Sequence, residues 1–184
     1  MTQVIKIAVS TRPDWKYLGI ASLQIIGASL FIGLCAQVKI PLPFTPVPLT
    51  GQTFAILFVG VLLGSKKGAL AALLYLIEGS LGLPVWAGGA SGFLHLIGPT
   101  GGYRLAYILQ AYLAGRIAEA KKTFTKTAFT LTSICCLQML LGSLWLGYFV
   151  GWNQILLKGF YPFIPGEIIK SLLVATYLKY RGEV

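Results

Sequence analysis

Long apolar runs separated by short polar segments dominate the chain. A helix needs roughly 20 apolar residues to cross a hydrocarbon core about 30 Å thick. Runs of this kind predict helices near residues 16–38, 50–64, 67–78, 103–118, 126–150 and 163–180. The third run is short, and a re-entrant segment is the alternative there. The pattern predicts an all-α integral membrane protein, with residues 1–184 forming a single transmembrane domain.

Composition agrees with this fold class. Hydrophobic residues make up 56% of the 184 positions and charged residues only 11%, and the mean hydropathy is +0.77. These values lie far from those of soluble domains. A polar segment precedes the first run, and no small-residue cleavage site follows that run, so no removable signal peptide is expected.

The basic residues indicate how the helices are oriented. If all six runs cross the membrane, eleven of the 15 basic residues collect on one side: Lys6, Arg12, Lys16, Lys66, Lys67, Arg116, Lys121, Lys122, Lys126, Lys179 and Arg181. Basic residues favour the cytoplasmic side of a membrane. Both termini are therefore expected in the cytoplasm, and crossing by the third run is favoured over the re-entrant alternative.

The net charge of +10 does not indicate nucleic-acid binding, because the basic residues form small clusters between apolar runs. Cys35, Cys135, Cys136 and the single histidine His95 lack the ligand spacing of a zinc site. No metal and no nucleic acid are expected as partners.

Two connections on the outer side differ from ordinary loops. KIPLPFTPVPLTGQT holds four of the nine prolines, and alternating proline predicts a stiff, extended flap. The second, residues 79–103, holds eight glycines and no Asp, Glu, Lys or Arg. Such a segment is expected to fold over or into the helices, because irregular backbone at membrane depth must find polar partners in the protein. A packed extracellular cap is the alternative reading.

Four charged residues are predicted to converge beneath this outer face. Glu167 and Lys170 occupy the first turns of the last helix, Glu78 opens the long loop, and Arg104 begins the next helix. Ionisable groups inside a bundle are costly, and they usually pair with each other or face a substrate cavity. Together with the aromatic Trp86 and Tyr103, they predict a pocket for a small, mostly apolar molecule that ends in an anion.

Four segments, in order along the chain, carry a family resemblance: PFTPVPLTGQT, YLIEGSLGLPVWAGGASG, LIGPTGGYRLAY and PFIPGEIIK. They resemble the BioY family, the biotin-specific substrate-capture subunits (S components) of energy-coupling factor (ECF) transporters. The resemblance implies six helices with an N-in/C-in arrangement in the bacterial plasma membrane. It also implies high-affinity capture of biotin from outside the cell and its delivery across the membrane.

The same resemblance implies no enzyme activity and no cofactor, since biotin is the substrate. The implied partners are an ECF transmembrane coupling subunit and two ATPase subunits. ATP hydrolysis is expected only in those partners, because GPTGGYR lacks the Lys-Ser/Thr ending of a phosphate-binding P-loop.

The chemistry of biotin assigns expected roles to the candidate residues. We expect Lys170 to supply a cationic donor, Glu167 and Glu78 to accept hydrogen bonds, and Trp86 and Tyr103 to form walls. The backbone of the glycine-rich loop at Gly88, Gly89 and Gly101 is expected to supply further polar contacts. Arg104, which follows this loop, is the last predicted contact. From the sequence, either the carboxylate end or the ureido end of biotin is able to meet Lys170.

Two other functions compete with transport. Ser91 lies in a Gly-x-Ser-Gly context with His95 following, which resembles the nucleophile motif of intramembrane serine proteases. A serine nucleophile needs a base within hydrogen-bond reach, and a serine between glycines is more often a turn residue. A channel is the third reading, although no pore-ring motif is present in the sequence.

Overall fold

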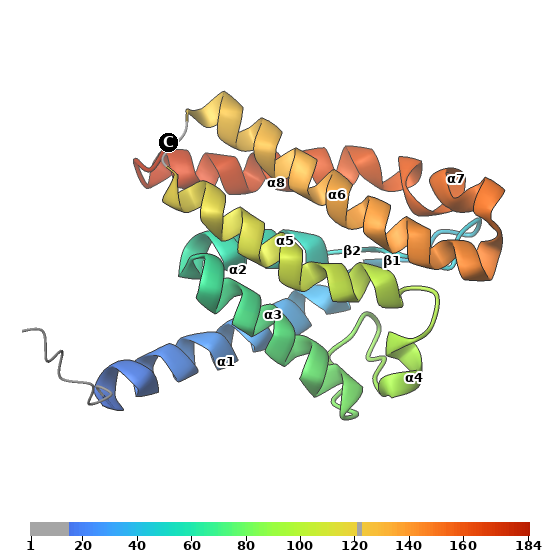
Figure 1. The fold of residues 1–184 in the computed structure, drawn as a ribbon, viewed down its shortest axis with the longest axis horizontal. Coiled ribbons are helices and arrows are strands. Elements are labelled where there is room, and N and C mark those ends of the chain that lie inside the picture. The colour runs from blue at the N-terminus through green and yellow to red at the C-terminus, as the bar shows by residue number, and fades with distance from the viewer. Residues whose placement is uncertain (1–14, 121–122) are drawn as a thin grey trace, which may run out of the picture.

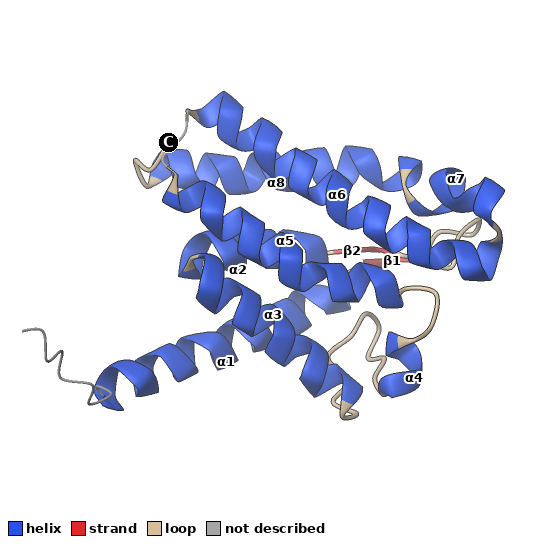
Figure 2. Cartoon of the chain, in the orientation of Figure 1, coloured by secondary structure: helices blue, strands red, loops and turns tan. Residues whose placement is uncertain are grey.

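The structure, a computed structural model, is a bundle of helices with one short antiparallel hairpin (Figures 1 and 2). It describes residues 15–120 and 123–184, so the expectations for Lys6, Arg12, Lys121 and Lys122 lie outside the described residues. The elements are α1 (Trp15–Gln37), β1 (Lys39–Ile40), β2 (Leu49–Thr50), α2 (Gln52–Leu63), α3 (Ser65–Ser80), α4 (Phe93–Leu96), α5 (Gly101–Glu119), α6 (Phe124–Val150), α7 (Ile155–Gly159) and α8 (Ile164–Tyr180), with short 3₁₀ helices at Trp152–Gln154 and Tyr161–Phe163.

The helical fold class predicted from the apolar runs is confirmed, and α1, α2, α3, α5, α6 and α8 cover those runs. By length and composition, α1 and α6 are each sufficient to cross a membrane, and α2 is a shorter apolar helix. Large apolar side chains face outward along these helices, including Leu23 and Phe129. Apolar surface of this extent is characteristic of a membrane or protein interface.

Small residues bring α2, α3 and α5 into close contact. Gly64 has a φ of 80° and forms the sharp turn between α2 and α3, a conformation that costs glycine little. A Cβ at Gly115 on α5 would collide with the backbone of Ser65 at the start of α3. Close helix approach of this kind depends on small residues at the interface. The three helices therefore form the centre of the bundle, with α6 and α8 packed on one side (Figure 1).

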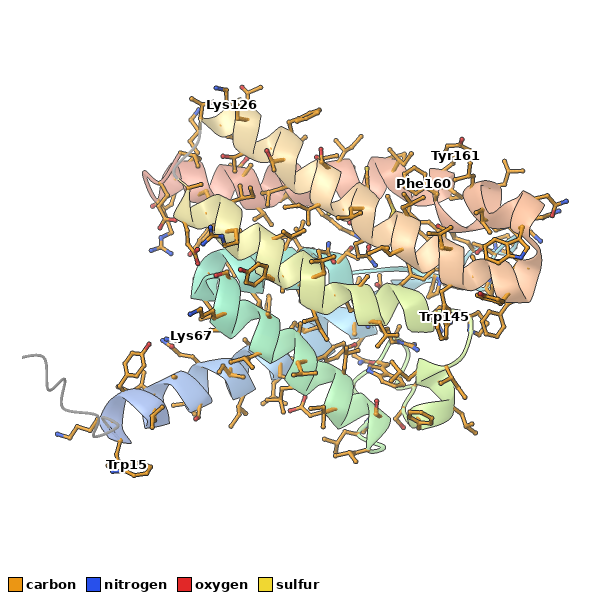
Figure 3. All side chains as sticks on the ribbon, viewed as in Figure 1. Trp15, Lys67, Lys126, Trp145, Phe160 and Tyr161 are labelled. Carbon is orange, nitrogen blue, oxygen red and sulfur yellow. The ribbon has the colours of Figure 1, made fainter. Side chains whose placement is uncertain are left out.

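The two ends of the bundle differ. One end carries the C-terminus, the α2–α3 turn and the end of α5 (Figure 1), and Lys67 and Lys126 lie toward this end (Figure 3). The other end carries the hairpin, α4 and α7, with Trp145, Phe160 and Tyr161 near it (Figures 2 and 3). This second end, called the loop end below, contains the irregular segments.

The proline-rich flap and the glycine-rich segment both pack against helices at the loop end. The flap is a hairpin in which Lys39 pairs with Thr50 and Ile40 with Leu49. In the glycine-rich segment, the Gly98 carbonyl accepts a 2.9 Å hydrogen bond from Trp145 Nε1 of α6. The Gly92 amide donates to the carbonyl of Gly79 at 2.7 Å. These bonds give irregular backbone the partners that it needs beside a helical bundle.

Candidate ligand-binding site

A cavity opens at the loop end, between the hairpin and the helices that begin there. Together with its open mouth, it spans about 530 Å³ of space free of atoms. The lining combines apolar walls with a small set of polar groups. Its residues are Val47, Pro48, Leu49, Thr50, Gln52, Thr53, Ala87, Thr100, Tyr103, Arg104, Tyr107, Gln138, Met139, Phe163, Glu167 and Lys170.

An ion pair at the start of α8 lines this cavity. Lys170 Nζ lies 2.7 Å from Glu167 Oε1, and both atoms are 2.7 Å from the hydroxyl of Thr53 on α2. The i, i+3 spacing places the two charges on one face of the helix. Glu167 is 3% exposed, and within the described part of the chain its second oxygen, Oε2, has no hydrogen-bond partner. The carboxylate therefore keeps spare acceptor capacity at this buried position.

Arg104, near the start of α5, supplies a second cation. Its guanidinium carbon lies 4.3 Å from the centre of the Trp86 ring, and NH1 donates to the His95 carbonyl. Cation–π contact of this kind stabilises a partly desolvated guanidinium. Among residues 15–120 and 123–184, no Asp or Glu forms a salt bridge with Arg104. A buried cation without an acidic partner favours an anion in the cavity beside it.

Two glutamines differ in how fully they are bonded. Gln52 donates to the hydroxyl of Tyr75, while its Oε1 accepts from Tyr107 at 3.4 Å and Thr50 at 3.1 Å. Gln138 of α6 donates from Nε2 to the Tyr103 carbonyl at 3.1 Å. No donor in the described segments reaches Gln138 Oε1.

The structure brings four of the predicted site residues together around the cavity: Tyr103, Arg104, Glu167 and Lys170. The Tyr103 hydroxyl already donates a hydrogen bond to the Gly159 carbonyl at 2.8 Å, so it is not available to donate to a ligand. Its ring therefore contributes apolar surface and holds α5 against α7.

The other five predicted site residues do not line the cavity. Glu78 accepts a hydrogen bond from Ser29 of α1, and Trp86 is fully buried beneath Arg104. Gly88 and Gly89 have φ values of 71° and 73°. A Cβ at Gly101 would collide with the Leu96 carbonyl. Each of them shapes the loop end, and a direct contact with ligand stays a prediction for them.

Sequence reasoning missed several lining residues, of which Thr53 and Gln138 bear most on the polar chemistry. A signal for Gln138 existed, because it is an isolated amide in the apolar run CCLQMLL, and polar side chains in membrane helices usually face the bundle interior. Thr53, Val47 and Phe163 lie inside the family-resemblance segments PFTPVPLTGQT and PFIPGEIIK, but their chemistry alone did not single them out. Only the packing of the hairpin and α8 against α2 places them at the cavity.

The serine protease alternative is not supported. His95 packs edge-on against the Trp86 ring with a centroid distance of 6.5 Å. No hydrogen bond joins Ser91 and His95 in the part of the chain that the structure describes. A nucleophile without a base within reach is not activated.

Comparison with known proteins identifies the family. The BioY family model matches residues 13–182. A probable biotin transporter BioY from Pyrococcus horikoshii is 38% identical over 144 residues, covering 78% of this chain and 86% of the relative. Biotin transporter BioY from Thermotoga maritima is 35% identical over 160 residues, covering 86% and 94%.

A solved structure agrees with the sequence relatives. The S-component for biotin from an ECF-type ABC transporter superposes with a TM-score of 0.75 at 28% identity, covering 94% of this chain and 95% of that one. The family match spans nearly the whole chain, and it includes every element that lines the cavity. This chain therefore belongs to the BioY family.

Proposed function

We propose that this protein is a biotin S component: it captures biotin in the loop-end cavity and delivers it across the membrane as part of an ECF-type transporter. As a BioY protein it is a transporter component, not an enzyme, and biotin is its substrate. One observation supports the location of the site: the cavity combines apolar walls, two cations and buried acceptor atoms without donors. Biotin offers an apolar thioether ring and aliphatic chain, a carboxylate, and a ureido ring with two N–H donors, which match these features.

Equilibrium binding tests this function directly. Purified protein in detergent is expected to bind biotin saturably in calorimetry, and mass spectrometry of the purified protein is expected to detect co-purified biotin. Cells that require external biotin are expected to grow on low biotin only when this protein is expressed with its transport partners. Saturable binding of another vitamin in place of biotin would contradict the proposal.

The ligand contacts that we propose follow the cavity geometry. Lys170 and Arg104 supply cationic donors, Glu167 accepts, and the Tyr103 ring forms a wall. We assign a supporting role to Trp86 and Glu78, which anchor Arg104 and α1 respectively. Gly88, Gly89 and Gly101 allow the loop to close near the cavity, which Ala87 and Thr100 of the same loop line.

The proposed topology has six crossing helices, α1, α2, α3, α5, α6 and α8, with both termini in the cytoplasm of a bacterial cell. The distribution of charge supports this topology. At the end of the bundle opposite the loop end, helix ends are flanked by basic residues: Lys66, Lys67, Arg116 and Lys126. Exposed aromatic residues, which favour membrane boundaries, occur at both ends, for example Trp15 and Trp152.

The proposed partners are a transmembrane coupling subunit and two ATPase subunits. The similarity to an ECF S-component supports an assembly of this type. Co-expression with an affinity tag on this chain is expected to retain all of these subunits in detergent. Retention of ATPases without a coupling subunit would contradict the proposed composition.

A further inference from the structure

We propose that Gln138 determines specificity by accepting a hydrogen bond from one ureido N–H of biotin, an inference that rests on the proposed function. Gln138 lies in the middle of α6, is 2% exposed and lines the cavity. Its amide orientation follows from chemistry. The Tyr103 carbonyl only accepts, so Nε2 must face it. Oε1 is thereby left as an acceptor, and no described residue donates to it.

A second acceptor of the same kind lines the same cavity. Glu167 Oε1 is bonded to Thr53 and Lys170, whereas Oε2 has no N–H or O–H donor within the described ranges. The buried Cys135 thiol of α6 is a further neighbour of this carboxylate. The neighbouring Gln52 shows the contrast, since both its amide atoms have partners. Buried acceptors in native proteins are normally paired. Two residues of the cavity lining, one on α6 and one on α8, therefore each have a spare acceptor atom, which matches a ligand with two donors.

The two acceptors also orient biotin. An ionised carboxylate has no hydrogen to donate, so the carboxylate end cannot satisfy Gln138 and Glu167. The ureido ring has two N–H groups flanking one carbonyl. Lys170 has three N–H donors and uses two of them in protein hydrogen bonds, which leaves one for the ureido carbonyl. The ring end therefore lies between α6 and α8, and the carboxylate extends toward Arg104 on α5.

A pair of buried glutamines provides a matched test. Gln138→Met removes the acceptor while keeping the length of the side chain. Gln110→Met is the control, because Gln110 is also buried with an unpartnered Oε1 but does not line this cavity. Calorimetry in detergent is expected to show Gln138→Met weakening biotin binding about tenfold or more. Gln110→Met is expected to stay within about twofold of the unsubstituted protein, since it changes stability rather than the site.

Modified ligands separate the two ends of biotin. Methylation of the ureido nitrogen that faces Gln138 is expected to weaken binding to the unsubstituted protein. The same methylation is expected to weaken binding to Gln138→Met much less, because both changes remove the same hydrogen bond. Converting the carboxylate to an amide is expected to weaken binding by the same factor in both proteins. That loss is expected to shrink in Arg104→Gln, the variant that lacks the proposed carboxylate partner.

The outcomes are distinguishable. Unchanged biotin affinity in Gln138→Met, or coupling of Gln138 to the carboxylate instead of to a ureido nitrogen, would overturn this inference while leaving biotin capture intact. Failure of the unsubstituted protein to bind biotin would overturn the proposed function itself. If Gln138→Met does not fold, Gln138→Asn serves instead, because it withdraws the acceptor by one methylene and is expected to weaken binding similarly.

Discussion

At the scale of single residues, the Glu167–Lys170 pair combines structural and binding roles. The pair is largely removed from water, and Thr53 links it to α2. Removing one member of a buried pair leaves the other charge without compensation, which costs more than losing both together. The separate contributions to folding and to binding are therefore measurable with single and double substitutions.

Lys170→Met is expected to lower the free energy of unfolding by about 2 to 3 kcal/mol, less than for a fully enclosed pair because the cavity opens to water. It is also expected to weaken biotin binding at least about tenfold. Unfolding in detergent and calorimetry measure the two effects. The double variant Glu167→Gln/Lys170→Met is expected to regain most of the stability but not the affinity. Normal affinity in the double variant would exclude the pair from the site.

Arg104 tests whether planar stacking matters in addition to charge. Arg104→Lys keeps the positive charge but loses the flat guanidinium that covers the Trp86 ring. Biotin affinity is expected to fall by about five- to tenfold, and the fluorescence of Trp86 is expected to change. Lys158→Arg, on α7 outside the cavity lining, serves as the control. An Arg104→Lys variant with full affinity would show that charge alone is sufficient.

At the scale of elements, helix packing depends on positions where a single methyl group does not fit. Gly115→Ala is expected to lower the free energy of unfolding by about 1 to 3 kcal/mol, because its Cβ would collide with the Ser65 backbone. Gly27→Ala is the matched control, since no atom lies within 4 Å of the position of its Cβ. Thermal unfolding in detergent compares them. Equal stability of the two variants would mean that α3 and α5 separate at little cost.

A second element-scale feature is the attachment of the glycine-rich loop to α1. Gln37 Nε2 donates to the carbonyls of Gly33 and Trp86 at 3.0 and 3.3 Å, and Oε1 accepts from the Gly89 amide at 3.1 Å. One side chain therefore holds the end of α1 and the loop together. The loop in turn places Ala87 at the cavity.

Gln37→Ala is expected to accelerate hydrogen exchange at the Gly89 amide and to increase the rate of biotin dissociation by a few fold, on the order of one lost hydrogen bond. Gln24→Ala, on the same helix but bonded to Lys67 near the opposite end, is expected to change neither rate. Exchange measured by mass spectrometry and dissociation measured by competition provide the readouts. Unchanged exchange at residues 86–89 would show that other contacts hold the loop.

At the scale of the whole molecule, the two ends of the bundle predict its orientation. The end of the bundle that carries the C-terminus has the basic clusters, and the loop end has the cavity. In a variant without native cysteines, a cysteine in place of Phe44 in the hairpin loop is expected to react with a membrane-impermeant maleimide in intact cells. A cysteine in place of Gly182 is expected to react only after the cells are permeabilised. The reverse labelling pattern would invert the proposed topology.

The sequence by itself determined the features that depend on local patterns. Apolar runs determined the helical fold class, because burial in lipid requires long stretches without charge. Ordered motifs indicated the BioY family, and intramembrane charge identified Glu167, Lys170 and Arg104, which all line the cavity. These signals can be read from the sequence without knowing which segments pack against each other.

Only the tertiary structure decided how side chains share the space between helices. It placed Gln138 and Thr53 at the cavity, and it positioned Trp86 beneath Arg104. It also paired Glu78 with Ser29. The hydrogen bonds of Gln138 and Thr53 join residues 35 and 114 positions apart. The physical reason is that a polar atom's role depends on which partners the fold brings within hydrogen-bonding distance, and residue spacing along one helix does not encode those partners.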